Sequence, residues 1–155
     1  MMSVFTYRKQ IKLKKEFDDI YAALLKSKVE VGNYSYHCIS VNNKFAFVPK
    51  ADTFLAGNSA IPNVTAVVEE TETDYKVDLE FSALPFVRIF SIIFTIFAAV
   101  IGIICIIPSL QSGTFNLGIV ICGGLILFNY VSIRIGLILN SKRFISELLY
   151  ELTGK

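Results

Sequence analysis

The sequence predicts an α+β membrane protein, in which a small antiparallel β-sheet with one amphipathic helix is joined to a two-helix transmembrane hairpin. Residues 89–133 contain no Asp, Glu, Lys, Arg or His, although 18% of the whole chain is charged. The residues before this stretch alternate between apolar and polar side chains, which is typical of half-buried strands. The residues after it have apolar side chains at helical spacing, which predicts a C-terminal helix that returns to the sheet; the alternative is a helix that lies on the lipid surface. The chain therefore divides into a sheet domain (1–83), a transmembrane hairpin (84–139) and an amphipathic tail helix (140–155).

The first strand and the first helix are predicted from a change of period. In VFTYRKQIKL the apolar side chains Phe5, Tyr7, Ile11 and Leu13 fall on one side of an extended chain. In KKEFDDIYAALLKS the spacing becomes helical, and we expect one apolar face to be buried. That face consists of Phe17, Ile20, Tyr21, Leu24 and Leu25.

Three further apolar runs, VEV, YSYHCISV and KFAFVP, are separated by Gly32-Asn33 and Asn42-Asn43. Gly and Asn tolerate the positive φ angles of tight turns, so these runs predict a three-stranded meander. Residues 49–63 have the composition of a connection. The following run, VTAVVEETETDYKVDLEF, fits either a hairpin that turns near residues 71–74 or one long strand.

The charge-free region is long enough for two membrane crossings. A transmembrane helix needs about 20 apolar residues, and Pro108 with the polar stretch SLQSGTFN divides the region into two such lengths. We expect spans at about 86–108 and 117–139 with an outer loop at 109–116. A soluble core would instead have to bury two helices that are apolar on every face, which a domain of this size cannot do.

Arg88 and Arg134 flank the charge-free region and are predicted to be membrane-interface anchors, with their guanidinium groups at the headgroups. A functional charge inside the membrane is the alternative for Arg134. Basic residues gather before the first span and after the second span and are missing from the loop 109–116. Because basic residues favour the cytoplasmic side, both termini are expected to be cytoplasmic. The sequon at Asn63 would then be unused and the cysteines reduced.

Small residues let helices approach closely in lipid. Ala98 and Gly102 in the first span, and Gly118 and Gly123 in the second, are therefore predicted to pack helix against helix, within the hairpin or between copies of the chain. Neither span has an ionisable residue at its centre, so the sequence predicts no proton relay or ion pathway.

The chain shows no pattern typical of catalysis. His37 and Cys38 are neighbours on a predicted strand and should point to opposite faces, which disfavours a nucleophilic pair. The acids between residues 69 and 80 lack metal-loop spacing and are expected to form a solvated strand face. No phosphate loop, GxSxG or HExxH occurs. We therefore predict no catalytic, cofactor-binding or metal-binding residues and no enzyme activity.

A net charge of +2, with basic and acidic residues interleaved, gives no reason to expect nucleic-acid binding. The expected partners are the lipid bilayer and either another protein or further copies of the chain. The sequence thus predicts a membrane-anchored cytoplasmic binding module. The alternatives are a homo-oligomeric membrane protein that acts as a transport or pore accessory, and a small immunity-type protein that protects against a membrane-acting toxin.

Overall fold

A computed structural model describes residues 4–14, 20–31, 34–41, 44–50, 61–113 and 117–153. It confirms an α+β fold with an antiparallel sheet. The elements are β1 (Thr6–Lys14), α1 (Ile20–Lys26), β2 (Lys28–Val31), β3 (Tyr34–Val41), β4 (Lys44–Pro49), β5 (Pro62–Glu70), β6 (Asp74–Ala83), α2 (Pro85–Ser112) and α3 (Leu117–Thr153).

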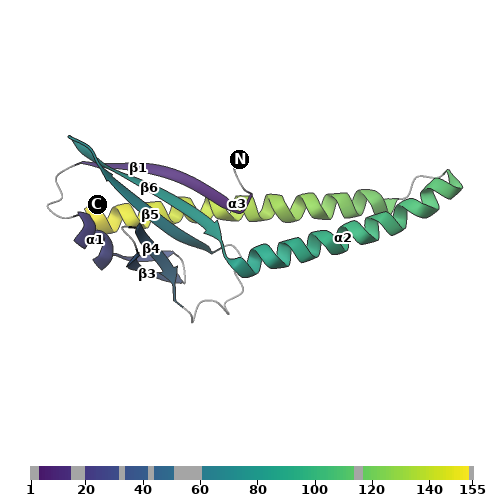
Figure 1. Cartoon of the computed structure of the whole chain (residues 1–155), viewed down its shortest axis with the longest axis horizontal. Helices are drawn as coiled ribbons and strands as arrows, with labels where there is room; N and C mark the ends of the chain where they lie inside the picture. Colours follow the sequence, from purple (N-terminus) through teal and green to yellow (C-terminus); the bar gives the residue numbers. More distant parts are fainter. Residues whose placement is uncertain are drawn as a thin grey trace.

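The molecule is elongated, with the curled sheet at one end and two long helices projecting from it (Figure 1). We call α2 together with residues 117–139 of α3 the apolar hairpin. The helix α3 does not stop at the base of this hairpin but continues alongside the sheet. The amphipathic tail predicted for residues 140–155 is thus the continuation of α3 as far as Thr153.

The sheet has the strand order β1-β6-β5-β4-β3-β2, and all neighbouring strands are antiparallel. Strands β2, β3 and β4 form the predicted meander, while the turn residues 32–33 and 42–43 lie outside the described part of the chain. The run from residue 64 to 81 is a hairpin, closed by a 2.9 Å hydrogen bond from Thr71 N–H to Asp74 O. Strand β1 pairs with β6, so the first strand lies beside the strand that leads into α2.

The core of the sheet domain lies between the inner face of the sheet and the last part of α3. The ring of Phe144 is 1% exposed and makes edge contacts with Tyr36, Phe47 and Phe81, with ring centroids 5.2, 5.2 and 5.6 Å apart. Further along α3, Leu148 and Leu152 join the same core. The apolar face of the tail therefore docks on the sheet, because the strands supply apolar side chains that one short helix cannot cover.

The helix α1 buries a narrower face than the sequence predicted. Ile20 and Leu24 are fully buried, but Tyr21 and Leu25 are 44% and 46% exposed. Residues four apart lie on the same side of a helix, and the next residue is rotated by about 100°. The pair at 20 and 24 faces the sheet, which turns the pair at 21 and 25 toward solvent. Phe17, predicted for the same face, lies outside the described residues.

The apolar hairpin carries its hydrophobic side chains outward. Both helices are long and apolar enough to cross a membrane. Only 11% of the most apolar 18-residue stretch of α2 is buried, and 6% of that of α3. Pro108 does not end α2, which continues to Ser112. The helix ends instead at Gly113, whose φ of 65° is the left-handed conformation that glycine adopts at helix C-termini.

Candidate functional site

The sheet domain and the apolar hairpin meet at a second, smaller hydrophobic cluster. Its buried members come from the end of β6, the start of α2 and the middle of α3, and Phe5, Tyr7 and Ile133 pack against them. The buried residues are Ala83, Leu84, Val87 and Leu137. This junction is where the strand β6 becomes the helix α2 and where α3 passes from the hairpin to the sheet.

Arg88 and Arg134 both lie at this junction. The Arg134 guanidinium donates a hydrogen bond to the backbone carbonyl of Thr6, and its central carbon lies 5.6 Å from the ring centroid of Tyr7, within the range of a cation–π contact. The Nε of Arg88 donates to the carbonyl of Ala83 at 2.9 Å. Since Thr6 pairs with Ser82, the two arginines bind the backbone of adjacent strands. Their role as membrane-interface anchors stays a prediction.

A polar cluster connects the two helices just beyond the junction. Asn129 Nδ2 donates to Ser91 Oγ at 2.7 Å, and the Thr95 hydroxyl donates to the Ser91 carbonyl at 2.8 Å. The Tyr130 hydroxyl lies 3.2 Å from Thr95 Oγ1. Ser91 is 1% exposed, so its hydroxyl depends on Asn129 rather than on water for a hydrogen bond.

This cluster was not predicted from the sequence, because none of its residues is charged. Its signal was the spacing of Ser91, Thr95, Ala98 and Gly102, which places small or polar side chains on one face of α2. That face is the one that contacts α3.

The predicted helix-packing residues divide into two groups. Ala98 and Gly102 are buried, and a Cβ at Gly102 would lie 3.5 Å from the Cβ of Cys122. Gly118 is half-buried four residues before Cys122, on the same face of α3. A Cβ at Gly123 would meet nothing within 4 Å, so Gly123 does not contact α2 within this hairpin, and its part in packing between copies stays a prediction. It follows Cys122 by one residue, and the rotation of about 100° turns it away from α2.

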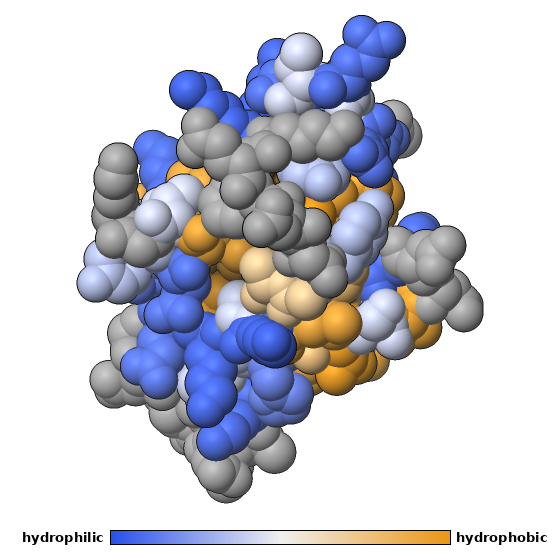
Figure 2. All heavy atoms as spheres, turned by 90° about the vertical axis from the view of Figure 1, so that its left-hand side faces the viewer, coloured by the Kyte–Doolittle hydropathy of each residue, from blue (hydrophilic) through white to orange (hydrophobic). Residues whose placement is uncertain are grey.

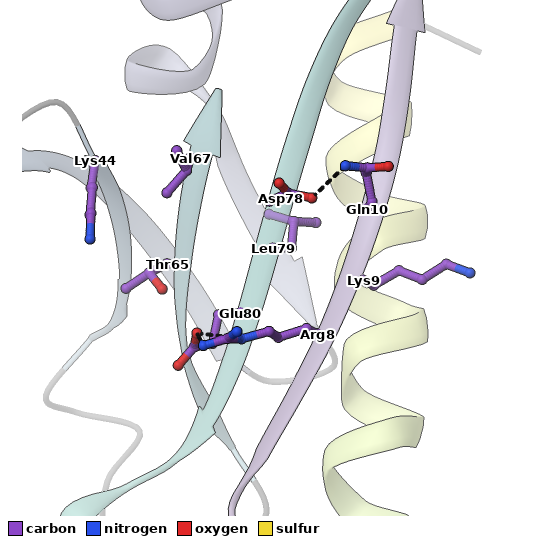
Figure 3. Close-up of a pocket in the computed structure, with 9 residues that line it drawn as sticks. All are labelled: Arg8, Lys9, Gln10, Lys44, Thr65, Val67, Asp78, Leu79 and Glu80. Carbon is purple, nitrogen blue, oxygen red and sulfur yellow. Dashed lines mark hydrogen bonds and ion pairs between the residues drawn. The ribbon is translucent and has the colours of Figure 1, made fainter. Parts of the chain in front are cut away.

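The outer face of the sheet, opposite α3, forms a shallow and half-open hollow of about 570 Å³ (Figure 3). Arg8 and Glu80 form an exposed ion pair across β1 and β6, with Nη2 and Oε2 2.7 Å apart. Beside them, Gln10 Nε2 donates to Asp78 Oδ1 at 2.8 Å. Two of the acids predicted to form a solvated strand face are thus paired with side chains of β1.

The same strand pair also brings like charges together. Lys12 lies directly opposite Lys76, a destabilising like-charge arrangement, while Glu69 of β5 faces Lys76 from the other side. Among the residues that the structure describes, neither lysine forms an ion pair, and the same holds for Lys9 and Lys14. Strand β1 is at the edge of the sheet, so Lys9, Lys12 and Lys14 lie along that edge, with Lys76 on the neighbouring strand β6.

His37 and Cys38 lie on opposite faces of β3. His37 is exposed, whereas Cys38 is half-buried and packs against the core. Burial raises the pKa of the Cys38 thiol from 9.0 to about 11. The thiol is therefore protonated at neutral pH and points away from the imidazole, an arrangement unsuited to nucleophilic chemistry.

Within the described ranges, no group of three His, Cys, Asp or Glu side chains is arranged to hold a metal ion. Comparison of the chain with protein-family models, with curated proteins and with solved structures finds no match. The function is therefore inferred from three parts of the molecule: the junction, the outer face of the sheet and the β1 edge.

Proposed function

We propose that the protein is a non-catalytic binding module, anchored in a membrane by the apolar hairpin, that presents its sheet domain at the cytoplasmic surface to a protein partner. The anchoring is supported by the outward-facing hydrophobic side chains of both helices, since only 11% and 6% of the most apolar 18-residue stretch of each helix is buried. The core helix of a soluble protein would be largely covered. Lipid is the environment that removes such a surface from water.

The distribution of polarity along the molecule supports this arrangement. Figure 2 views the end furthest from the hairpin, where hydrophilic side chains surround a smaller apolar area. Arg88 and Arg134 lie at the junction between the two parts, at the level where headgroups would meet the hairpin. Basic residues flank the hairpin in the sequence on both sides, at Lys76, Arg88, Arg134, Lys142 and Arg143, and this favours the cytoplasmic side for the sheet domain.

Binding of a macromolecule suits the outer sheet face better than binding of a small molecule. Small-molecule sites enclose most of the ligand within a mostly apolar cavity. The hollow on the outer face is instead open, and charged and polar residues of β1, β4, β5 and β6 line it together with Val67 and Leu79. Such a surface matches the polar face of another protein.

The orientation can be tested by cysteine labelling in intact cells, in a background that carries Cys38→Ser, Cys105→Ala and Cys122→Ala. Gln111→Cys places a thiol at the tip of the hairpin, and Glu72→Cys places one in the turn between β5 and β6; both positions are exposed. A membrane-impermeant maleimide should label the first from outside, and the second only after lysis. Labelling of Glu72→Cys alone would invert the orientation, and extraction of the chain by carbonate would refute membrane insertion.

The partner can be sought by chemical cross-linking in the source membranes, followed by purification in detergent and mass measurement. A stoichiometric second protein is the expected result. An immunity-type role is the same arrangement with a membrane-acting toxin as the partner, which this experiment would identify. Recovery of the uncomplexed chain alone would contradict a binding module.

A homo-oligomeric membrane protein is the second candidate. It is favoured by Gly123 and Gly124, which lie open on the outer face of α3, where a second hairpin has room to approach closely. Mass measurement in lipid nanodiscs separates the two candidates. A strict monomer refutes this one, and a defined oligomer that Gly124→Leu dissociates would support it.

A further inference from the structure

Among the residues that the structure describes, strand β1 pairs with β6 on one side and with no strand on the other. Phe5 O accepts a hydrogen bond from Ala83 N–H, and the register then makes Tyr7, Lys9 and Ile11 the residues that bond to β6. In an antiparallel pair the alternate residues point their N–H and C=O groups the other way. Those residues are Arg8, Gln10 and Lys12, and their backbone groups face away from the sheet. Such a row is a template for a further strand.

The side chains along this edge are basic. Lys12 and Lys76 form a pair without mutual backbone hydrogen bonds, the kind in which side chains approach most closely. The side chain of Lys9 lies on the opposite side of β1 from the hollow (Figure 3). In the described part of the chain, Arg8 has a carboxylate partner, but Lys9, Lys12 and Lys76 have none. Glu69 of β5 lies opposite Lys76, so the excess of positive charge is on β1 itself, where Lys9 and Lys12 have no carboxylate partner in the described residues. The edge therefore offers backbone hydrogen bonds and positive charge together.

We infer that the β1 edge binds an extended acidic segment of a protein partner, which adds to the sheet as a seventh strand beside β1. This inference rests on the proposed function and names the surface and the chemistry of the partner. Backbone hydrogen bonds to Arg8, Gln10 and Lys12 supply the pairing, as in other cases of strand addition. Carboxylates of the added segment lie beside Lys12 and Lys76 and relieve their repulsion.

The charges and the geometry disfavour other occupants. A second copy that paired through its own β1 would bring the same basic side chains together. The other edge strand, β2, has only four residues and is in contact with α3. An anionic lipid surface would meet only the start of the edge, because β1 leads away from the hairpin and its far end is about 27 Å from Thr6 at ~3.4 Å per residue.

The test measures fluorescence anisotropy of a labelled peptide of alternating valine and glutamate with the full chain in phosphatidylcholine nanodiscs. The acidic peptide should bind, and a valine–lysine peptide of equal length should not. The double variant Lys12→Glu, Lys76→Glu should weaken binding at least about tenfold. Its matched control is Lys28→Glu, Lys142→Glu, which changes the net charge equally at exposed positions in β2 and α3 and should stay within about twofold.

A second variant tests the backbone without changing charge. Gln10→Pro removes a backbone N–H that faces away from the sheet, and it removes no hydrogen bond to β6. Edge strands tolerate proline at such a position. It should weaken binding at least about tenfold, whereas Gln10→Ala, which also loses the side-chain bond to Asp78 but keeps the N–H, should not. Circular dichroism confirms that each variant keeps the sheet.

The inference is overturned if the acidic peptide does not bind, if the control pair of lysines matters as much as Lys12 and Lys76, or if vesicles of phosphatidylserine displace the peptide. The proposed function fails separately. A cross-linked partner that still binds the Lys12→Glu, Lys76→Glu variant would refute the edge as its site while leaving the protein-binding module in place.

Discussion

Phe144 lies at the centre of the sheet domain, in contact with aromatic rings from β3, β4 and β6. Phe144→Ala should lower the free energy of unfolding by about 3–5 kcal/mol, because a ring-sized cavity would remain among side chains held by the strands. Urea unfolding in detergent, followed by tyrosine circular dichroism, measures the change. Ser146 is two residues after Phe144 and is exposed, so Ser146→Ala should leave the unfolding midpoint unchanged.

Cys38 should be unreactive at ordinary pH. With its pKa raised to about 11, the thiolate fraction near pH 8 is about 100-fold smaller than for a thiol of pKa 9.0, and alkylation by iodoacetamide slows accordingly. The measurement uses the Cys105→Ala, Cys122→Ala background, with a small thiol as reference. Equal rates for Cys38 and the reference would contradict the burial described above.

The same shift makes stability depend on pH in a defined direction. The folded chain holds the Cys38 proton more tightly than the unfolded chain does, so this site leaves stability constant below pH 9 and lowers it as the pH rises from 9.0 toward 11. Cys38→Ala should flatten that part of the stability profile relative to the unsubstituted chain. A variant that loses stability just as steeply over this range would show that other groups cause the decline.

At the scale of the elements, the close contact between α2 and α3 depends on Gly102, which has no side chain and faces Cys122. Gly102→Ala should be tolerated, because the new Cβ would lie 3.5 Å from Cys122 Cβ, an ordinary contact. Gly102→Leu should separate the helices and lower the midpoint of denaturation by SDS in mixed micelles. Gly124→Leu is the matched control, since its side chain would enter open space on the far side of α3. Equal effects of the two leucines would place the helix contact elsewhere.

Alternation of apolar and polar residues was sufficient to predict β1 and β6, because every second side chain of a strand faces the core. Alternation does not encode which strands pair. The neighbours β1 and β6 are far apart in the sequence, and only the register from Thr6–Ser82 to Lys14–Asp74 shows that basic and acidic side chains meet there, and that Lys12 meets Lys76. The β1 edge was therefore invisible in the sequence.

The junction was partly predictable. The limits of the charge-free region identified Arg88 and Arg134, since charged side chains mark the ends of apolar helices. Their hydrogen bonds to Ala83 and Thr6 depend on the pairing of β1 with β6 and could not be foreseen. The end of α2 at Ser112 was also missed, because a proline in the last turns of a helix removes few hydrogen bonds while Gly113 supplies the left-handed ending.

At the scale of the whole molecule, the sheet domain is made of two segments that are distant in the sequence. A chain truncated after Leu139 lacks Phe144, Leu148 and Leu152 and should lose the cooperative unfolding transition of its sheet. A synthetic peptide of residues 140–153, added in trans, should restore tyrosine circular dichroism. A peptide in which Phe144 and Leu148 are replaced by serine is the control. A truncated chain that unfolds cooperatively without any peptide would contradict this account.

The continuity of α3 also fixes the order in which the protein can be completed. During synthesis the six strands are made first, then both helices of the hairpin, and only afterwards the side chains that fill the core. Until Leu152 has left the ribosome, the inner face of the sheet is exposed and open to non-native contacts, and to chaperones that recognise them. The sheet domain is therefore synthesised first but completes its core last, after both helices of the hairpin have been made.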